Sequence, residues 1–550
     1  MLVIASIWLI TLVIINPLGD FPLNDDWSYG LAVKRLVEHG GFHPTGWTAM
    51  PLITHVLWGS LFCIPAGFSF NALRLSTLTW SLLGILGTYL LMRTLRQARW
   101  LACGGALTMG FNPIYYALSN TFMTDVPFVA IMILASFFFV RYLRNSSDAD
   151  LLIGTACSLA ATLTRQLAVS VPVAFAFSLI LRYGAARRNL VRAVAPPAIC
   201  IVGLLAFQKW LAATGRLGAA YSVPNENLVN ALTDFRMIIP TLASRTYISL
   251  MYLGWFLLPL LIFAAVPLWR SHGRRATAIF VLSIGSIAAL GAARALVGKH
   301  VLMPLSSNIV LSSGIGPLTL RDTYVLKLNH VPALSHGFWP MVSAAALLGA
   351  AVLTTAIVFA LIDLVRKLRP ARLNENEAAS AFFLLSAAIY LAPLFIAGFF
   401  DRYLIFVMPL LAGSIVSASP GPLPSTSRVC RLAAVVLLVS LAYFGVCGTR
   451  DYLAWNRLRW QALHELMESK HATAEDIDGG FEFNGLYLYD ARYERDASKS
   501  WWWVRRDLYR IGFGPMPGYT IIREYDYSRW LPHGPGKVVV LEKSPSRSPG

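Results

Sequence analysis

The chain has 550 residues, of which 56% are hydrophobic and 13% charged, and its formal net charge is +18. Soluble domains carry about 25% charged residues, so an ordinary soluble surface is excluded. The positive charge does not predict nucleic-acid binding, because it falls in short clusters between apolar runs, which is typical of the cytoplasmic loops of membrane proteins. The clusters lie at residues 93–99, 141–144, 182–192, 270–275, 366–372 and 428–431.

Long apolar runs recur from Leu2 to Val446. A helix needs about 20 apolar residues to cross roughly 30 Å of hydrocarbon, and only helices or closed barrels can cross. These runs lack the alternation of barrel strands, so they predict helices. The first run has neither a basic segment before it nor a small-residue cleavage site after it, and we expect a retained first helix rather than a signal peptide.

The basic clusters also set the number of crossings, since each must return to the cytoplasm. A span over residues 51–66 would put the cluster at 93–99 outside, so we expect the segment between Pro51 and Pro65 to form a juxtamembrane or re-entrant helix. About 13 spanning helices remain. They are predicted at residues 2–18, 72–92, 100–117, 126–143, 151–165, 167–183, 191–212, 246–267, 276–297, 338–363, 378–399, 402–418 and 430–447.

This topology predicts an α-helical polytopic membrane domain over residues 1–447, with juxtamembrane helices in a first outer loop at residues 20–71. The turn at 119–125 and the loops at 213–245 and 298–337 also face outside. Mixed charge, alternating runs at 487–489 and 538–541, and Gly/Pro turns predict a small extracytoplasmic α/β or mainly β domain over residues 448–543. We expect residues 544–550 to be disordered.

Cysteine and tryptophan are unevenly distributed. All six cysteines lie in or beside apolar runs, which predicts neither a disulfide framework nor a CxxC metal site. The tail holds Trp501, Trp502, Trp503 and Trp530. These rings could stack on an acceptor glycan, or they could serve as core residues and interfacial anchors.

Two acidic sites fall on the outer side. Asp25 and Asp26 follow the first span, and Asp125 stands at the start of another. Adjacent carboxylates repel each other, which favours a raised pKa or a cationic partner, and a general base needs such tuning. The acids could instead be helix caps. Their shared side favours convergence, in which Asp25 and Asp125 deprotonate a hydroxyl or bind a hard divalent cation.

Cations also stand at outer helix ends. Arg165 interrupts an apolar hairpin, where an ionisable group is costly and indicates a functional role or a specific partner. Arg402 follows Asp401 at the head of a late span, so it either pairs with that acid or acts in the site. Lys299 opens a long outer loop, where it either snorkels to the interface or binds a ligand. A cation in such a position suits a phosphate group.

In their order and spacing these motifs resemble the GT-C superfamily of membrane glycosyltransferases. The nearest groups are the family 39-like enzymes, which include protein mannosyltransferases, lipid A aminoarabinose transferases and RgtA/B/C/D-like sugar transferases. The resemblance covers residues 1–420, and the tail resembles no family. It is carried by the acid doublet, the Pro-bounded helix, Asp125 in Thr124-Asp125-Val126-Pro127, Thr164-Arg165-Gln166 and Asp401-Arg402-Tyr403.

The resemblance implies inverting transfer of a sugar from a polyprenyl-phosphate carrier to an envelope acceptor, at the outer surface of a bacterial cytoplasmic membrane. Asp25 matches the family's general base, and Asp26 stands where relatives commonly have Glu. Asp125 matches a second acid that supports the site or, in some members, holds a metal, so a divalent cation is the one cofactor to consider. Arg165 and Arg402 match cations that bind the lipid phosphate.

One departure from the family concerns phosphate recognition. Relatives often have a Lys before the prolines of the juxtamembrane helix, and Thr48-Ala49-Met50-Pro51 has none. We therefore expect His43, Arg165 or Lys299 to substitute for it.

Two other classes of function compete with the transferase. A transporter or flippase of lipid-linked sugars would need polar groups near the middle of the membrane, whereas these charges lie at outer helix ends. A non-catalytic envelope scaffold would keep the fold without using the acids. Within the leading hypothesis the acceptor stays open between a lipid, a glycan and a protein.

Overall fold

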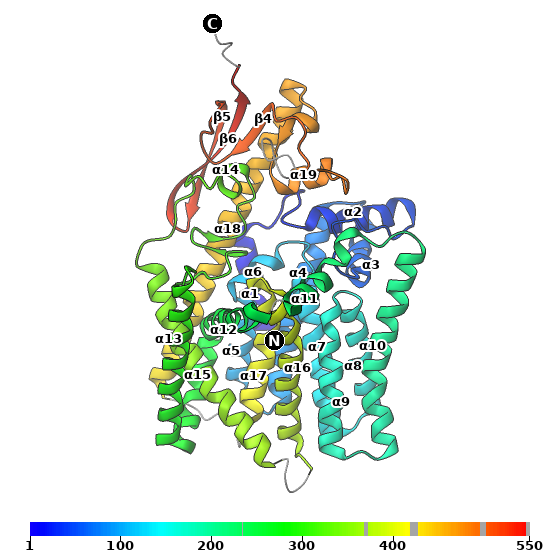
Figure 1. The fold of residues 1–550 in the computed structure, drawn as a ribbon, viewed down its shortest axis with the longest axis vertical. Coiled ribbons are helices and arrows are strands. Elements are labelled where there is room, and N and C mark those ends of the chain that lie inside the picture. Colours follow the sequence, from blue (N-terminus) through cyan, green and yellow to red (C-terminus); the bar gives the residue numbers. More distant parts are fainter. Residues whose placement is uncertain (234, 368–371, 419–426, 495–501, 546–550) are drawn as a thin grey trace.

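The computed structural model describes residues 1–233, 235–367, 372–418, 427–494 and 502–545. It consists of a helical bundle with a smaller helix-and-sheet region at one end (Figure 1). Within the described residues, ten helical segments are long and apolar enough to cross a membrane. The predicted polytopic α-helical fold is therefore confirmed.

Each of the ten long segments overlaps a predicted span. They are α4 (Phe70–Thr94), α7 (Asp125–Asn145), η1 with α9 (Gln166–Val169 and Ser170–Tyr183), α10 (Arg187–Ala213), α12 (Phe235–His272), α13 (Arg274–Leu296), α15 (Phe338–Lys367), α16 (Glu375–Ala397), η3 with α17 (Asp401–Phe406 and Val407–Ala418) and α18 (Arg428–Lys470). Of these, α12 and α18 extend well beyond their predicted spans.

The other three predicted spans are also helical, but each helix is short. They correspond to α1 (Leu2–Ile15), α5 (Arg99–Gly110) and α8 (Asp148–Thr162), with 14, 12 and 15 residues. The predicted span at 100–117 is broken because Asn112 caps a new helix, α6 (Pro113–Ser119), by accepting from the backbone N–H groups of Ile114 and Tyr115. Proline at the first position of a helix and Asn at its cap both favour such a start.

The segment between Pro51 and Pro65 forms an 11-residue helix, α3 (Ile53–Cys63), too short to cross alone. It follows α2 (Asp26–His39), and both lie at the end of the bundle that carries the C-terminal region (Figure 1). The loops that the sequence predicts to face outside hold further short elements. These are η2 (Ala219–Tyr221), α11 (Val223–Thr233), β1 (Val310–Leu311), β2 (Gly314–Ile315) and α14 (Arg321–Tyr324).

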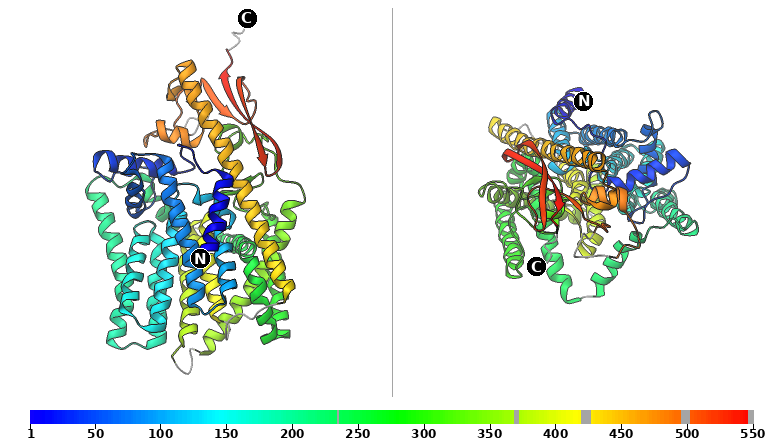
Figure 2. Two further views of the ribbon diagram at one scale, coloured as in Figure 1. Left: turned by 180° about the vertical axis from the view of Figure 1, so that it is seen from behind. Right: turned by 90° about the horizontal axis from the view of Figure 1, so that it is seen from above.

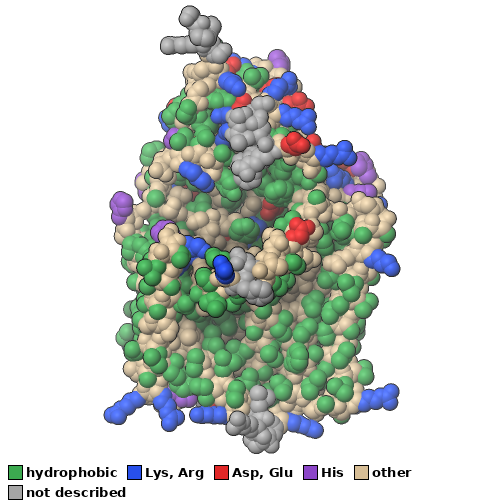
Figure 3. All heavy atoms as spheres, viewed as in Figure 1, with side chains coloured by type: hydrophobic (Ala, Val, Ile, Leu, Met, Phe, Trp, Pro, Cys, Tyr) green, Lys and Arg blue, Asp and Glu red, His purple; other side chains and the backbone are tan. Residues whose placement is uncertain are grey.

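Basic side chains line the opposite end of the bundle, as Figure 3 shows. At that end, α4 and α7 approach the start of α16. Oε1 of Glu375 lies 2.6 Å from Nη2 of Arg96, which follows α4, and 3.6 Å from Nη2 of Arg144 in α7. The predicted basic cluster at 366–372 is described only in part, since residues 368–371 lie outside the described residues. The described basic loops agree with the topology that the sequence predicts.

Close packing of small residues joins two of the longest spans. A Cβ atom added to Gly349 of α15 would lie 2.2 Å from the carbonyl oxygen of Gly254 in α12, and one added to Gly254 would lie 2.3 Å from the amide nitrogen of Ala350. Only glycine permits this approach, which is a common way for membrane helices to pack.

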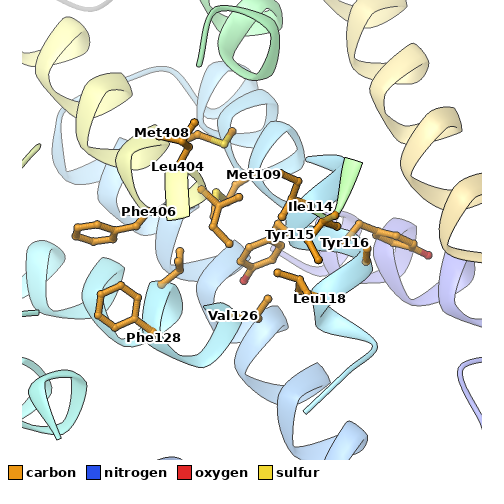
Figure 4. Packing of buried hydrophobic residues seen from close by; sticks show 14 of the residues in the cluster. Met109, Ile114, Tyr115, Tyr116, Leu118, Val126, Phe128, Leu404, Phe406 and Met408 are labelled. Carbon is orange, nitrogen blue, oxygen red and sulfur yellow. The ribbon is translucent and has the colours of Figure 1, made fainter. Parts of the chain in front are cut away.

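A buried apolar core packs α6, the start of α7 and η3 against one another. Figure 4 shows Ile114, Val126, Phe128 and Phe406 packed in this core. The rings of Phe128 and Phe406 have centroids 5.3 Å apart. Because Phe128 and Phe406 stand three and four residues after Asp125 and Arg402, this packing brings those two polar side chains to one place.

The C-terminal region begins inside a helix rather than at a linker. Helix α18 runs unbroken through the predicted boundary at 447/448 and rises out of the bundle (Figure 2). A four-stranded sheet follows in the order β3-β4-β6-β5, with β3 (Ile477–Asp478) parallel to β4 (Tyr509–Gly512) and the other pairs antiparallel. The remaining elements are η4 (Ala474–Asp476), α19 (Phe481–Leu488), β5 (Tyr519–Trp530) and β6 (His533–Lys543).

The C-terminal region contains one of the two strands that the sequence predicts. The run at 538–541 lies in β6 as predicted, whereas Tyr487 lies in helix α19, so the predicted strand at 487–489 is wrong. Trp502 and Trp503 are buried in an aromatic cluster with Trp27 and Phe481, which favours core packing over an open glycan platform. Trp501 and residues 546–550 lie outside the described residues. All six cysteines are free thiols.

Candidate active site

The loop after α1 carries the first acid pair and is held by a buried arginine. Arg74 of α4 donates hydrogen bonds to the carbonyl oxygens of Pro17, Gly19 and Phe21, at 2.6, 2.9 and 3.0 Å. Three backbone acceptors offset part of the cost of burying this cation. The loop is thereby fixed before it reaches Asp25.

Asp25 turns its carboxylate towards the bundle. Its Oδ1 accepts a hydrogen bond from the indole N–H of Trp47 at 2.9 Å, and its Oδ2 lies 3.7 Å from Nη2 of Arg402. Burial raises the pKa of Asp25, and the nearby charge of Asp125 adds to this effect, whereas Arg402 and Trp47 oppose it. Asp25 makes no side-chain hydrogen bond that caps α2, so the alternative interpretation as a cap is wrong here.

Asp26 points elsewhere, although it is the neighbour of Asp25. Its Oδ2 accepts a hydrogen bond from the backbone N–H of Leu23 at 3.2 Å, and the side chain is buried. Burial raises the pKa of Asp26 to about 8, against opposing contributions that include the charge of Arg74. This carboxyl group is therefore largely neutral at pH 7 and supports the turn.

Asp125 lies between two guanidinium groups. Its Oδ1 is 3.1 Å from Nη1 of Arg165 and 3.8 Å from Nε of Arg402. Nε of Arg165 also donates to the hydroxyl oxygen of Thr124 at 2.8 Å, which orients that guanidinium. Neither Asp125 nor Thr124 makes a side-chain hydrogen bond that caps α7, although Asp125 lies in the first turn, where the helix dipole favours an anion.

We call Asp25, Asp125, Arg165 and Arg402 the acid–arginine cluster. Tyr403 lies between its two cations, with its ring centroid 5.1 Å from the guanidinium carbon of Arg165 and 5.8 Å from that of Arg402. In the part of the chain that the structure describes, Nη2 of Arg165, Nε of Arg402 and both oxygens of Asp125 are buried without a hydrogen-bond partner. Such groups are costly when unpaired, so the cluster is suited to a polar ligand.

The remaining candidates do not join this cluster. Asp401 makes no ion pair with the guanidinium of Arg402 within the described residues; its carboxylate accepts from the backbone N–H groups of Ile309, Val310 and Arg402. Lys299 and His43 are exposed, and within the described residues neither makes an ion pair or hydrogen bond to the cluster. The prediction that either of these two substitutes for the missing Lys therefore lacks structural support, and Arg165 alone stands in the cluster.

Three further residues that the sequence did not predict as participants contact the cluster. Trp47, Thr124 and Tyr403 all contact the cluster, as described above. Thr124 and Tyr403 were visible as neighbours of the candidate residues in their motifs. Trp47 is 22 residues from Asp25, and only the fold of the outer loop brings them together.

The cluster does not fit a divalent cation. Oxygen-rich sites with several carboxylates bind such ions, but each of the two carboxylates here faces a guanidinium, which repels a cation. Among the described residues, no three His, Cys, Asp or Glu side chains come together as a candidate metal site. The two buried arginines favour an anion instead.

The face of the molecule shown in Figure 3 is hollowed between the bundle and the C-terminal region, with acidic and basic side chains visible in the recess. A separate cavity of about 430 Å³ opens at the basic end of the bundle, where Asp363, Lys367 and Glu377 contribute to its lining. None of the predicted site residues lines that cavity.

Comparison with known proteins identifies one matching family model. Residues 47–212 match the family described as dolichyl-phosphate-mannose-protein mannosyltransferase. This match supports the predicted resemblance to the GT-C superfamily over that segment of the chain. The matched segment contains Trp47, Asp125 and Arg165, whereas Asp25 and Arg402 lie outside it. No curated protein sequence matches the chain.

Solved structures of similar proteins are distant. ArnT from Cupriavidus metallidurans bound to undecaprenyl phosphate is 12% identical with a TM-score of 0.40, and 99% of this chain and 98% of that chain are covered. The apo form of ArnT is 14% identical, with a TM-score of 0.36 and coverages of 98% and 97%. The oligosaccharyltransferase AglB from Archaeoglobus fulgidus is 15% identical, with a TM-score of 0.37 and coverages of 90% and 61%.

Proposed function

We propose that this protein transfers a sugar from a polyprenyl-phosphate donor to a hydroxyl group of an envelope acceptor, at the outer face of a bacterial cytoplasmic membrane. The observation that carries the proposal is the convergence of two arginines and two aspartates in one buried cluster. Glycosyl transfer from a phosphate donor needs a clamp on the leaving phosphate and a base for the acceptor, and the arginines and Asp25 of the cluster offer both.

The arginines supply the clamp in this proposal. Arg165 is held by Asp125 and Thr124, and its Nη2 is free to donate to a phosphate oxygen. Arg402 is more loosely placed, since its two carboxylate partners lie 3.7 and 3.8 Å away, beyond hydrogen-bond distance. A donor phosphate would draw Arg402 to itself and leave Asp25 free to accept a proton.

Asp25 supplies the base. A raised pKa makes a carboxylate a stronger base, provided that it is ionised at the working pH. The hydroxyl oxygen attacks the anomeric carbon, the bond from that carbon to the phosphate oxygen breaks, and the hydroxyl proton passes to Asp25. Attack opposite the leaving phosphate inverts the anomeric centre.

Two further observations support the donor class and the side of the membrane. The matched family is named for a polyprenyl-type phosphate sugar, dolichyl-phosphate-mannose. The cluster lies at the end of the bundle away from the basic loops, which the positive-inside rule assigns to the outer side. The sugar and the acceptor are the parts that an assay must identify.

The direct test measures transfer of radiolabelled sugar from a panel of polyprenyl-phosphate sugars to endogenous envelope acceptors in membranes. Wild type is compared with Asp25→Asn and with Asp26→Asn at equal protein level. Asp26→Asn is the matched control, because its carboxyl group is largely neutral and an amide oxygen can still accept from Leu23. We expect transfer to disappear in Asp25→Asn only. Persistent transfer in Asp25→Asn contradicts the assignment of the base, and no transfer by wild type favours a transporter or a scaffold.

A further inference from the structure

The C-terminal region meets α2 directly beside Asp25. A Cβ atom added to Gly485 of α19 would lie 2.3 Å from the ring of Trp27, so the two helices touch closely at this point. The ring of Phe481 packs against Trp27 and Trp47, with centroids 6.1 and 5.7 Å apart. Trp47 in turn donates its indole N–H to Asp25. Helix α19 therefore supports one direct partner of the proposed base.

A second contact runs through a buried carboxylate. Glu482 is fully buried, and its Oε1 accepts a hydrogen bond from the backbone N–H of Asn24 at 3.0 Å. Its Oε2 accepts from the hydroxyl of Thr319 at 2.7 Å and from Nη2 of Arg459 at 2.8 Å. We call Glu482, Asn24, Thr319 and Arg459 the Glu482 network. It joins α18, α19, the loop at 298–337 and the first outer loop.

The residue that Glu482 holds has an unusual backbone. Asn24 has φ +55°, in the left-handed region, which few residues other than glycine adopt. Asn adopts this conformation more readily than most residues, and the hydrogen bond from its N–H group to Glu482 fixes it. Here it sets the direction in which the chain enters α2, and hence the position of Asp25 one residue later.

We propose that Glu482 is a positioning residue for Asp25, so that the C-terminal region forms a working part of the active site. This inference rests on the proposed function of Asp25 as the base. Glu482 does not reach the substrate; it acts through the backbone of Asn24. A region that only covered the bundle would not need a buried carboxylate that accepts a hydrogen bond from Asn24, the residue before the base.

Electrostatics give the proposal a readout that packing alone would not affect. Burial is the main cause of the raised pKa of Asp25, and the negative charges of Asp125 and Glu482 contribute in the same direction. Loss of the Glu482 charge therefore lowers the pKa of Asp25. The acid limb of the pH profile for transfer then moves to lower pH.

The test compares Glu482→Gln with Glu482→Asp in the full-length protein. An amide offers a single acceptor oxygen and cannot satisfy three donors, whereas the shorter Asp keeps the charge but does not reach Asn24. We expect both variants to lower kcat about 10- to 100-fold without changing KM for the donor, as misplacement of a catalytic group does. Only Glu482→Gln should shift the acid limb to lower pH.

Asp322→Asn is the matched control. Asp322 is another buried carboxylate of the outer loop, and it accepts from the backbone N–H of Phe513 in the C-terminal region at 2.7 Å, but it does not contact Asn24. We expect this variant to lose stability without a comparable loss of kcat. An equal loss of kcat in Asp322→Asn, or unchanged kcat in both Glu482 variants, overturns the proposal.

Hydrogen exchange tests the link without relying on activity. We expect the amides of residues 20–28 to exchange faster in Glu482→Asp than in wild type, and to be unchanged in Asp322→Asn. Unchanged exchange in Glu482→Asp overturns the positioning role. If wild type transfers no sugar from any donor, the proposed function fails, while the exchange result still decides whether Glu482 holds Asn24.

Discussion

Two buried groups of charges lie near each other in this protein, and they are built differently. In the Glu482 network, both carboxylate oxygens accept hydrogen bonds of 2.7 to 3.0 Å. In the acid–arginine cluster, the ion-pair distances are 3.1, 3.7 and 3.8 Å, and both oxygens of Asp125 lack a hydrogen-bond partner within the described residues. A network with satisfied acceptors holds a structure together, whereas an unsatisfied one is prepared for a ligand.

The largest expected effect comes from removing the base. Asp25→Asn should lower the rate of transfer about 10²- to 10⁴-fold, the usual contribution of general base catalysis. In wild type the rate should also fall as the pH is lowered through the pKa of Asp25, which burial raises above the usual carboxyl range. A pH series of initial rates measures this limb. A rate that rises as Asp25 becomes protonated would contradict its role as base.

Replacing one arm of the clamp should have the next largest effect. Arg402→Lys keeps the charge but loses the planar fork that binds two phosphate oxygens. Hydrogen bonds to charged groups contribute about 1.5–3 kcal/mol, which corresponds to roughly 10- to 100-fold weaker use of the donor. The measurement is kcat/KM for the donor, with Arg450→Lys outside the cluster as control. Equal values for wild type and Arg402→Lys would show that the clamp lies elsewhere.

A stability test separates the fold from the site. Gly349→Ala places a Cβ atom 2.2 Å from the carbonyl oxygen of Gly254, whereas Gly285→Ala in α13 meets nothing within 4 Å. Overpacking of a tight contact costs about 1–3 kcal/mol. We expect a lower melting temperature in detergent for Gly349→Ala alone, with KM for the donor unchanged in both. Equal melting temperatures for Gly349→Ala and Gly285→Ala would show that α12 and α15 can move apart at little cost in stability.

The smallest expected effect is that of metal removal. Because the carboxylates of the acid–arginine cluster already face guanidinium groups, we expect transfer to persist in excess EDTA. Initial rates before and after chelation, with Mg²⁺ and Mn²⁺ added back, measure this. A rate that is lost with EDTA and restored by one ion would show that a cation enters the cluster with the donor.

The sequence predicted the fold class well and the site in part. Long apolar runs and basic connectors identify helices because both features are local, and the order of the motifs pointed to Asp25, Asp125, Arg165 and Arg402. Asn112 followed by Pro113 is a local signal for the start of a new helix. The apolar residues on both sides made the segment look like one continuous span, so the break was not predicted. The divergent roles of Asp25 and Asp26 depend on the backbone at Asn24, which a residue 458 positions away in the chain holds. No local pattern carries that information.

The central claim is that the acid–arginine cluster binds a polyprenyl phosphate through Arg165 and Arg402. The most direct measurement is equilibrium binding of undecaprenyl phosphate to purified protein in detergent, for wild type, Arg165→Gln, Arg402→Gln and Glu482→Asp. We predict at least about tenfold weaker binding in both arginine variants, since each removes a charged donor, and unchanged binding in Glu482→Asp. Binding that stays the same in both arginine variants would contradict the account.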